Sequence, residues 1–210
     1  MKLTTNTATF YAYDLTSTEA NRMVLTRNAI VSFDNEPLVL VDEHNQVQGY
    51  DSKVACHQGQ GQLHRAFSVF VFNRHNEVLL QQRSALKPLW PLYWSNSCCS
   101  HPRRGEDELA SVKRRLKEEL SIAPHPEFLY RFRYQAEFAD IGAENELCSV
   151  YIARSDKRVI VNESEVADCR YIAPEALDRE LRENASHYTP WLKLEWPCIR
   201  EKFWSQVASL

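Results

Sequence analysis

Several features that define whole classes of protein are missing from this 210-residue sequence. No segment approaches the roughly 20 consecutive apolar residues that a membrane-spanning helix needs. The first residues, MKLTTN, lack the apolar run of a secretion signal. Only five glycines are present, and no repeat or Gly/Ser-rich linker divides the chain. The net charge of −3 gives no basic surface, so we expect neither nucleic acid nor an anionic membrane as a partner.

The cysteines also lack the regular spacing of a disulfide framework. The six are Cys56, Cys98, Cys99, Cys148, Cys169 and Cys198. Two adjacent residues in an otherwise scattered set indicate free thiols in a reducing compartment. Hydrophobic residues make up 44% of the chain and charged residues 25%, which is ordinary for a folded domain. We therefore expect a cytoplasmic enzyme with a sizeable core.

Hydrophobic periodicity predicts alternating strands and helices. Strands are expected at residues 38–42, 67–72, 78–83, 128–138 and 147–153, and the turn at 73–77 joins the second and third of them as a hairpin. A helix is expected at 106–120, because its leucines and valine recur on one stripe. Two helices follow, one at 174–183 and one opened by Thr189 as N-cap with Pro190 at its first position, and Pro197 should kink or split the second.

These elements predict a single α/β (α+β) domain over residues 1–210, with a mixed sheet flanked by helices. The core is expected at about residues 38–153 and C-terminal helices at about 174–208. Residues 16–20 could cap a short N-terminal helix.

The octet Ser95-Asn96-Ser97-Cys98-Cys99-Ser100-His101-Pro102 places a thiol beside an imidazole. On an extended chain the side chains of Cys98 and Cys99 point in opposite directions, so one can pack while the other faces a site. A free cysteine is often only a small buried hydrophobe, and Cys98 fits that description better.

Five further groups are candidates for a metal site. Each of them alone is most simply explained as a solvated side chain. Together, three imidazoles and two carboxylates, which lie two residues apart in the sequence as on one face of a strand, would suit a divalent ion that prefers octahedral coordination. They are His57, His64, His101, Glu144 and Glu146.

Charged residues elsewhere indicate an anion site. Glu118 and Glu119 end the predicted helix, where acids oppose the helix dipole, so a hard cation such as Mg²⁺ bridged to a phosphate could compensate them. The alternative for Glu118 is a solvated last turn. The candidate anion binders, each of which alone is more simply a solvated charge, are Lys53, Arg83, Lys87 and Arg115. Trp90, Trp94 and Trp191 are most simply core or rim aromatics.

Taken together, these segments resemble the type 1 isopentenyl-diphosphate isomerases, a branch of the Nudix fold. The matching motifs are Lys53 with His57 and His64, Leu63-His64-Arg65-Ala66-Phe67-Ser68, Asn96-Ser97-Cys98-Cys99-Ser100-His101-Pro102, Glu144-Asn145-Glu146, and Thr189-Pro190-Trp191. In the Nudix helix pattern, Glu106, Arg114, Glu118 and Glu119 are in place. Arg115 replaces a metal-binding Glu, and Ser100 and Ser121 replace glycines.

The resemblance implies a Nudix-like sheet flanked by helices and the conversion of isopentenyl diphosphate to dimethylallyl diphosphate. It implies that His57, His64, His101, Glu144 and Glu146 hold one divalent metal, which would be Mn²⁺, Mg²⁺ or Zn²⁺. Glu119 would hold Mg²⁺ against the diphosphate, which Lys53, Arg83, Lys87 and Ser100 would also bind. No flavin is implied.

The resemblance also implies the catalytic groups. Protonation of C4 and loss of a proton from C2 pass through a tertiary cation at C3. Glu146, aided by Tyr134, would supply the proton, and Cys99 would remove one from the other face. The ring of Trp191 would stabilise the cation, by about 2 kcal/mol or more when desolvated. Because the reaction is reversible, the pairing of Cys99 with Glu146 is a firmer prediction than the direction of transfer.

Two alternatives remain. A Nudix hydrolase of a nucleotide or other diphosphate is favoured by Glu118-Glu119 and the basic cluster, but Arg115 replaces a carboxylate that metal-assisted hydrolysis needs. A structural zinc module is favoured by Cys and His, but paired C-x₂₋₄-C spacing is absent.

Overall fold

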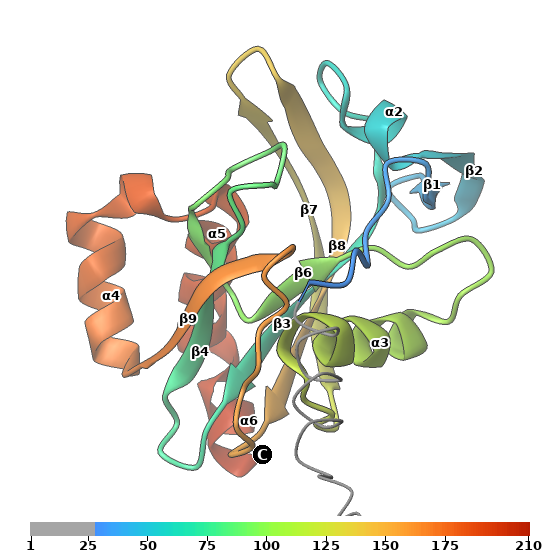
Figure 1. Cartoon of the computed structure of the whole chain (residues 1–210). Helices are drawn as coiled ribbons and strands as arrows, with labels where there is room; N and C mark the ends of the chain where they lie inside the picture. The colour runs from blue at the N-terminus through green and yellow to red at the C-terminus, as the bar shows by residue number, and fades with distance from the viewer. Residues whose placement is uncertain (1–27) are drawn as a thin grey trace, which may run out of the picture.

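The computed structural model describes residues 28–210, which form a twisted mixed sheet with helices on both faces (Figure 1). The main path of the sheet is β2-β1-β3-β4-β5, while β6 and β8 also pair with β3, β7 pairs with β8, and β9 pairs with β4. The strands are β1 (Pro37–Val41), β2 (Val47–Ser52), β3 (His64–Phe72), β4 (Val78–Arg83), β5 (Trp94–Ser95), β6 (Cys98–Ser100), β7 (Glu127–Phe138), β8 (Gly142–Arg154) and β9 (Val166–Ile172). No helix among the described residues is long and apolar enough to cross a membrane.

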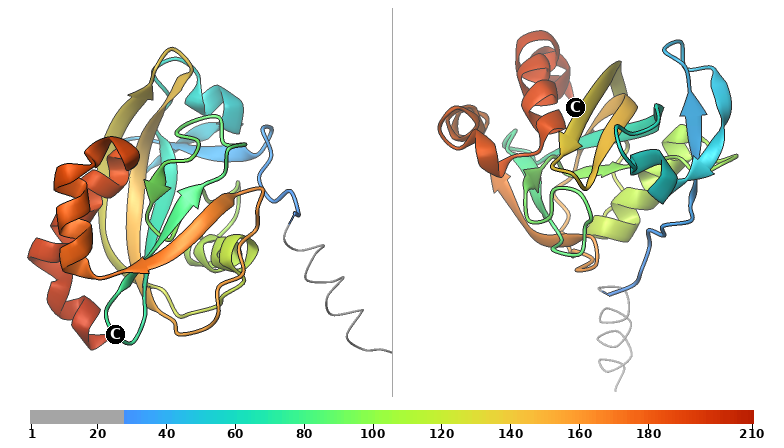
Figure 2. Two further views of the ribbon diagram at one scale, coloured as in Figure 1. Left: turned by 60° about the vertical axis from the view of Figure 1, so that its left-hand side comes forward. Right: turned by 90° about the horizontal axis from the view of Figure 1, so that it is seen from above.

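The helices lie in two groups on opposite sides of the sheet (Figure 2). One group is at the C-terminus, and α3 covers the other face. The helical elements are α2 (Lys53–His57), α3 (Glu108–Leu120), α4 (Pro174–Glu183), η1 (Ala185–His187), α5 (Pro190–Cys198), the π-helical η2 (Ile199–Phe203) and α6 (Trp204–Ser209).

Strand β3 holds the two layers together because it is apolar on both faces. Phe67, Val69 and Val71 pack with the buried stripe of α3. Phe70 and Phe72 point the other way, into the core beneath the C-terminal helices. This alternation is the two-residue period of a strand. The parallel partner β8 is buried along most of its length as well, so the centre of the sheet is shielded from water on both sides.

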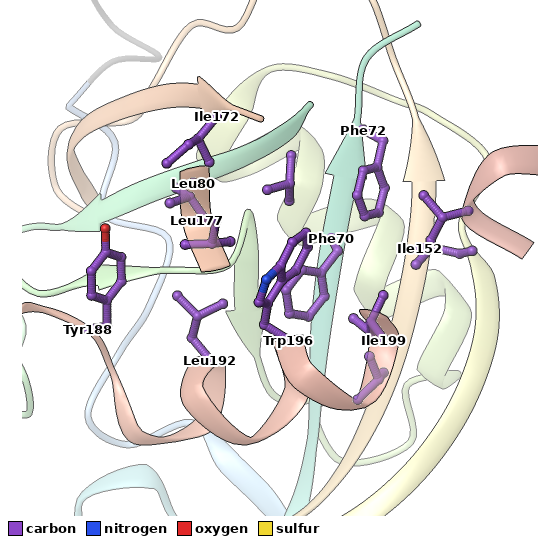
Figure 3. Close-up of a cluster of buried hydrophobic side chains, with 13 residues drawn as sticks. Phe70, Phe72, Leu80, Ile152, Ile172, Leu177, Tyr188, Leu192, Trp196 and Ile199 are labelled. Atoms are coloured by element: carbon purple, nitrogen blue, oxygen red, sulfur yellow. The ribbon is translucent and has the colours of Figure 1, made fainter. Parts of the chain in front are cut away.

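The core under the C-terminal helices is built around Trp196 (Figure 3). This side chain is 1% exposed and stacks near Phe70 and Phe72, with ring centroids 6.2 and 6.5 Å away. Burying an aromatic side chain of this size stabilises the fold by about 1.5–3 kcal/mol. The packing fixes α5 against the sheet, and α5 carries Trp191 toward the site described below.

Most of the predicted elements are confirmed within a few residues, and α3 shows why the boundaries differ. It begins at Glu108 rather than 106, because the side chain of Asp107 caps it by accepting from the backbone N–H of Ala110 at 2.9 Å. It ends at Ser121, a non-glycine residue in the left-handed region with φ 57°. Pro197 lies inside α5, and the helical backbone continues without a gap through the π-helical η2 into α6, so the predicted split does not occur at Pro197.

One further detail of the prediction is wrong, a second is confirmed without the side-chain hydrogen bond of a cap, and a third falls outside the described residues. The hairpin of β3 and β4 is paired only at its turn, at Phe72 and Val78, because β4 diverges to pair with β9. Thr189 occupies the N-cap position, but its hydroxyl makes no cap hydrogen bond and lies 3.1 Å from Ser95 Oγ instead. The N-terminal helix expected near residues 16–20 lies outside the described residues.

Candidate active site

A cavity of about 280 Å³ opens between α2, the loop 84–93, the β7–β8 hairpin and the start of α5. The predicted site residues that line it are Lys53, His57, Arg83, Lys87, Cys99, Ser100, His101, Tyr134, Glu144, Glu146 and Trp191. Two predicted residues, His64 and Glu119, are buried and do not line it. A larger groove of about 880 Å³ runs along α4 and α5 on the outside of the molecule, but none of the predicted site residues lines it.

Strand pairing explains how residues far apart in the sequence meet at this cavity. His64 opens β3 and lies directly opposite Glu146 of the parallel strand β8. Glu144 lies two residues earlier on β8 and therefore on the same face. His57 ends α2, and His101 follows β6. One donor atom from each of the five side chains lies within 4.8 Å of the others.

The hydrogen bonds of two histidines fix which nitrogen faces this cluster. Nδ1 of His57 lies 2.6 Å from the carbonyl oxygen of Lys53, and Nδ1 of His64 lies 2.7 Å from that of Gln62. A carbonyl can only accept, so each Nδ1 carries the hydrogen and each Nε2 presents a lone pair. Second contacts of this kind orient histidines that bind metals.

The lone pairs in the cluster lack donors. Nε2 of His57 and Oε2 of Glu144 are 2.8 Å apart, yet neither has a hydrogen-bond partner, and Nε2 of His64 has none either. Two acceptors at this distance repel each other unless a proton or a cation lies between them. Protonation of His57 would satisfy one pair only. The donor set of three imidazoles and two carboxylates therefore fits a divalent metal ion.

Burial keeps two of the imidazoles neutral, which is the form that binds metal. Burial and the neighbouring His57 lower the pKa of His64 to about 4. Burial, with His64 and His57 nearby, lowers the pKa of His101 well below its usual value. In the carboxylates, burial raises the pKa of Glu146 well above its usual value and the charge of Glu144 adds to this, whereas for Glu144 the histidines, His57 first, outweigh burial and lower the pKa.

A glycine allows the metal-ligand cluster to close. The Cα of Gly142, at the start of β8, lies so near α2 that an added Cβ would be 2.4 Å from the carbonyl oxygen of His57. Any larger side chain would push the β7–β8 hairpin away from α2. Glycine at this position therefore sets the distance between His57 and Glu144.

The thiol and the carboxylic acid reach the cavity from different strands. In β6, Cys99 pairs with Ser68 of β3 and its side chain lines the cavity. Cys98 points the opposite way, with its Sγ 3.4 Å from Glu119 Oε1, as the alternation predicts. Tyr134 lies opposite Glu146 in the β7–β8 register and donates its hydroxyl to Glu146 Oε2 at 2.7 Å.

Electrostatics hold protons on these groups. Burial, followed by the charge of Glu195, raises the pKa of the Cys99 thiol to about 12. Burial and the charge of Glu146 raise the pKa of Tyr134 well above its usual value. The indole N–H of Trp191 lies 3.1 Å from Cys99 Sγ, so the aromatic ring and the thiol are neighbours at one end of the cavity.

The predicted anion binders Lys53, Arg83 and Lys87 line the cavity. Arg83 and Lys87 already make contacts with other groups of the protein. Arg83 donates from Nε and Nη2 to the carbonyl of Leu89, at 3.2 and 2.8 Å, which holds the loop 84–93 in place. Lys87 forms an ion pair with the buried Glu165. Lys53 is half-buried, and its desolvation together with the charge of Lys87 lowers its pKa to about 8.

Arginine side chains pair with the acidic residues at the end of α3. Arg115 is 2% exposed and lies 2.8 Å from Glu119 and 2.9 Å from Glu165. Arg114 pairs with Glu118 at 3.0 Å. Arginine side chains therefore already compensate the acids at the end of α3, and Mg²⁺ at Glu119 stays a prediction.

Sequence reasoning missed two buried residues that organise the site. Glu165 forms ion pairs with both Lys87 and Arg115. Burial alone would raise its pKa, but the two positive charges outweigh burial and lower the pKa to about 2. Asn96 contacts both Cys99 and Trp191. Glu165 lies in an irregular acidic segment with no periodic signal. Asn96 lies within the octet 95–102, but the sequence alone assigns it no role.

Comparisons with known proteins agree with this arrangement. The model of the NUDIX domain matches residues 62–192. The chain is 41% identical over 175 residues to "Isopentenyl-diphosphate Delta-isomerase 1" of Photorhabdus laumondii, covering 82% of this chain and 99% of that protein. It is 40% identical over 157 residues to "Isopentenyl-diphosphate Delta-isomerase" of Nocardia farcinica, covering 74% and 90%.

Solved structures of similar shape support the fold. The crystal structure of DR0079 from Deinococcus radiodurans superposes with a TM-score of 0.63 at 22% identity, over 77% of this chain and 98% of that one. A MutT protein from Methanosarcina mazei gives a TM-score of 0.54 at 14% identity, over 67% and 96%. With these relatives and the site geometry together, the chain belongs to the isopentenyl-diphosphate Delta-isomerase family and carries that family's NUDIX domain.

Proposed function

We propose that this protein interconverts isopentenyl diphosphate and dimethylallyl diphosphate by moving one double bond, in the biosynthesis of isoprenoids. The observation that carries the proposal is that Cys99 and Glu146 line one small, partly apolar cavity beside Trp191. A volume of about 280 Å³ lies at the small end of the range for ligand sites and suits a five-carbon substrate. Six free cysteines support a cytoplasmic location.

Two divalent cations are part of this proposal. One, Mn²⁺, Mg²⁺ or Zn²⁺, would be held by His57, His64, His101, Glu144 and Glu146. The other, Mg²⁺, would be held by Glu119 against the substrate diphosphate, which requires Arg115 to release that carboxylate. When bound, these ions would make the Glu146 carboxyl a stronger acid and offset the charge of the diphosphate.

The diphosphate would bind at the charged end of the cavity. Lys53, Arg83 and Lys87 line that end, and Ser100 offers a hydroxyl beside them. Arg83 keeps one guanidinium nitrogen, Nη1, without a protein hydrogen bond among the described residues. Binding energy gathered at the diphosphate would fix the hydrocarbon between the two proton-carrying groups.

Proton transfer would begin at Glu146. The forward reaction requires a proton on this carboxyl, and Tyr134 orients the group through its 2.7 Å hydrogen bond. Transfer of the proton to C4 forms the C3 cation. For Cys99 to remove a proton from C2 as a thiolate, its thiol, whose pKa burial raises to about 12, must first release its own proton to solvent. One proton passes from Glu146 to Cys99 in each forward turnover, so exchange with solvent must restore the starting state. In reverse, the thiol donates and the carboxylate accepts.

Trp191 would stabilise the cation with its ring. The side chain is 2% exposed, and a desolvated aromatic face can stabilise a cation by about 2 kcal/mol or more. We expect Trp191→Ala to lower kcat more than it raises KM, because the cation exists only near the transition state. Steady-state kinetics would test this, and a change in KM alone would contradict it.

The second candidate is a diphosphate hydrolase, which the NUDIX domain makes reasonable. Hydrolysis would use several carboxylates of α3 to hold activating metals. Here Arg115 stands among them and pairs with Glu119, which favours isomerisation.

One assay separates the two. The purified protein is incubated with isopentenyl diphosphate and divalent metal in D₂O, and deuterated dimethylallyl diphosphate is measured by NMR. Isomerisation predicts deuterium incorporation with the diphosphate intact. Release of phosphate from nucleoside diphosphates, with no isomerised product, would instead support the hydrolase.

A further inference from the structure

The side chain of Asn96 is completely buried in the connection between β5 and β6. Its amide nitrogen donates to two backbone carbonyls, that of Cys98 at 2.9 Å and that of Val69 at 3.2 Å. Carbonyl oxygens only accept, so the nitrogen must face them. The orientation of the amide is therefore settled by its surroundings, and Oδ1 points the other way.

Three donors converge on that oxygen. The thiol of Cys99 lies 2.7 Å from Oδ1, the indole nitrogen of Trp191 3.1 Å and the hydroxyl of Ser95 2.9 Å. Ser95 and Trp191 are buried and Cys99 is partly buried at the edge of the cavity, so an unpaired group here is costly. The amide oxygen is thus the point that the thiol and the indole share.

The network gives the sulfur a partner for each of its roles. As a thiol, Cys99 can donate its hydrogen to Asn96 Oδ1. As an acceptor, the sulfur lies 3.1 Å from the indole N–H of Trp191, and that N–H also has Ser95 Oγ at 2.9 Å. One oxygen has only two lone pairs, so the three donors cannot all bond to it fully at once. The indole is therefore able to turn its hydrogen bond toward the sulfur.

We propose that Asn96 is a positioning residue that fixes the Cys99 sulfur and the Trp191 ring relative to each other. It contacts the Cys99 sulfur and the Trp191 indole but does not itself carry the transferred proton or line the cavity. It holds the proton-carrying thiol and the cation-stabilising ring at one end of the cavity, so that both face the same carbon skeleton. This role rests on the proposed isomerase function, although the contacts themselves do not.

A neighbouring residue supplies a matched control. Ser97 is equally buried; its hydroxyl donates to the carbonyl of Leu79 at 2.6 Å and accepts from the backbone N–H of Val71 at 2.7 Å. It braces the same connection but has no hydrogen bond to Cys99 or Trp191. Ser97→Ala therefore reports the cost of loosening the connection alone.

The kinetic test compares the two variants at matched stability. We expect Asn96→Ala to lower kcat roughly 100-fold with KM changed less than about 3-fold, since misplacing a reacting group by about 1 Å can cost that much. Ser97→Ala should keep kcat within about 3-fold of wild type. Equal losses of kcat in the two variants would overturn the proposal, because they would assign Asn96 a purely structural role.

A spectroscopic test needs no turnover, and its first step uses only wild type and Cys99→Ala. The infrared S–H stretch of Cys99 is identified by subtracting the spectrum of Cys99→Ala from that of wild type. A thiol that donates to an amide oxygen absorbs at lower frequency than a free thiol, and the band should rise in Asn96→Ala but not in Ser97→Ala. A wild-type band at the free-thiol frequency would refute the proposal. Failure of the isomerase assay with a lowered band would instead refute the function and leave the contact in place.

Discussion

Replacement of Glu195 by glutamine should change how stability depends on pH. Glu195 lies on α5 with no exposed surface; its Oε1 is 3.7 Å from Cys148 Sγ, and its Oε2 has no hydrogen-bond partner. Burial raises its pKa to about 8, and hydrogen bonding from Ser68 and Cys148 offsets only part of that shift. The folded protein therefore keeps a proton on Glu195 at neutral pH, whereas the unfolded chain releases it.

The size of the effect follows from the two pKa values. The ordinary value for this carboxyl is 4.5, and the folded value is about 8. The stability present below pH 4.5 is lost as pH rises through the folded value, at about 1.4 kcal/mol per pH unit over this window. At pH 7 the cost is about 3 kcal/mol, against about 1 kcal/mol at pH 5. Glutamine does not titrate, so Glu195→Gln has no such pH-dependent cost at pH 5 or at pH 7.

Urea unfolding at pH 5 and pH 7 would measure this difference. The stability of Glu195→Gln relative to wild type should rise by about 2 kcal/mol between the two pH values. Any constant cost of the amide cancels in that comparison. Replacement of the exposed Glu201 by glutamine controls for the loss of one carboxyl group. A relative stability of Glu195→Gln that stays the same at both pH values would refute the reasoning.

Three other predictions concern the site. Cys99→Ala should abolish isomerisation with little loss of stability, whereas Cys98→Ala should keep most activity; a near-normal rate for Cys99→Ala, in the D₂O assay, would remove the thiol from the mechanism. Gly142→Ala should weaken divalent-metal binding about 10-fold or more in calorimetry, and unchanged affinity would contradict the close approach to α2. Glu165→Gln should free Lys87 from its fixed position and so raise KM for the diphosphate substrate, while kcat changes little. An unaltered KM would contradict this role.

The sequence predicts most of the sheet because periodic burial leaves a local signal. The alternation in β3 and the stripe of α3 are properties of neighbouring residues, and both elements were predicted within a few positions. The start of β8 at Gly142 was missed by five residues. That part of the strand carries the candidate metal ligands Glu144 and Glu146 instead of alternating apolar residues. The alternation that predicts a strand is therefore absent there.

The candidate site is less accessible to sequence reasoning, because its contacts join distant elements. That Glu119 pairs with Arg115, and that Glu165 joins the same network, depends on how α3 packs against the segment before β9. The hydroxyl of Thr189 bonds to Ser95 instead of capping its helix, since the two elements meet at the base of the cavity. Pairings of this kind are set by tertiary packing, which no local pattern encodes.

The register of β3 against β8 has a consequence for folding. His64 and Glu146 become neighbours only when two strands far apart in the chain align in parallel, and such long-range pairing forms slowly. The metal-ligand cluster cannot exist in the unfolded chain or after a one-residue slip of the strands, because a slip would turn Glu144 and Glu146 to the opposite face. A cation that binds there would select the correctly aligned sheet and shift the folding equilibrium toward it. Binding of a divalent metal at this cluster would thus be a measure of completed folding.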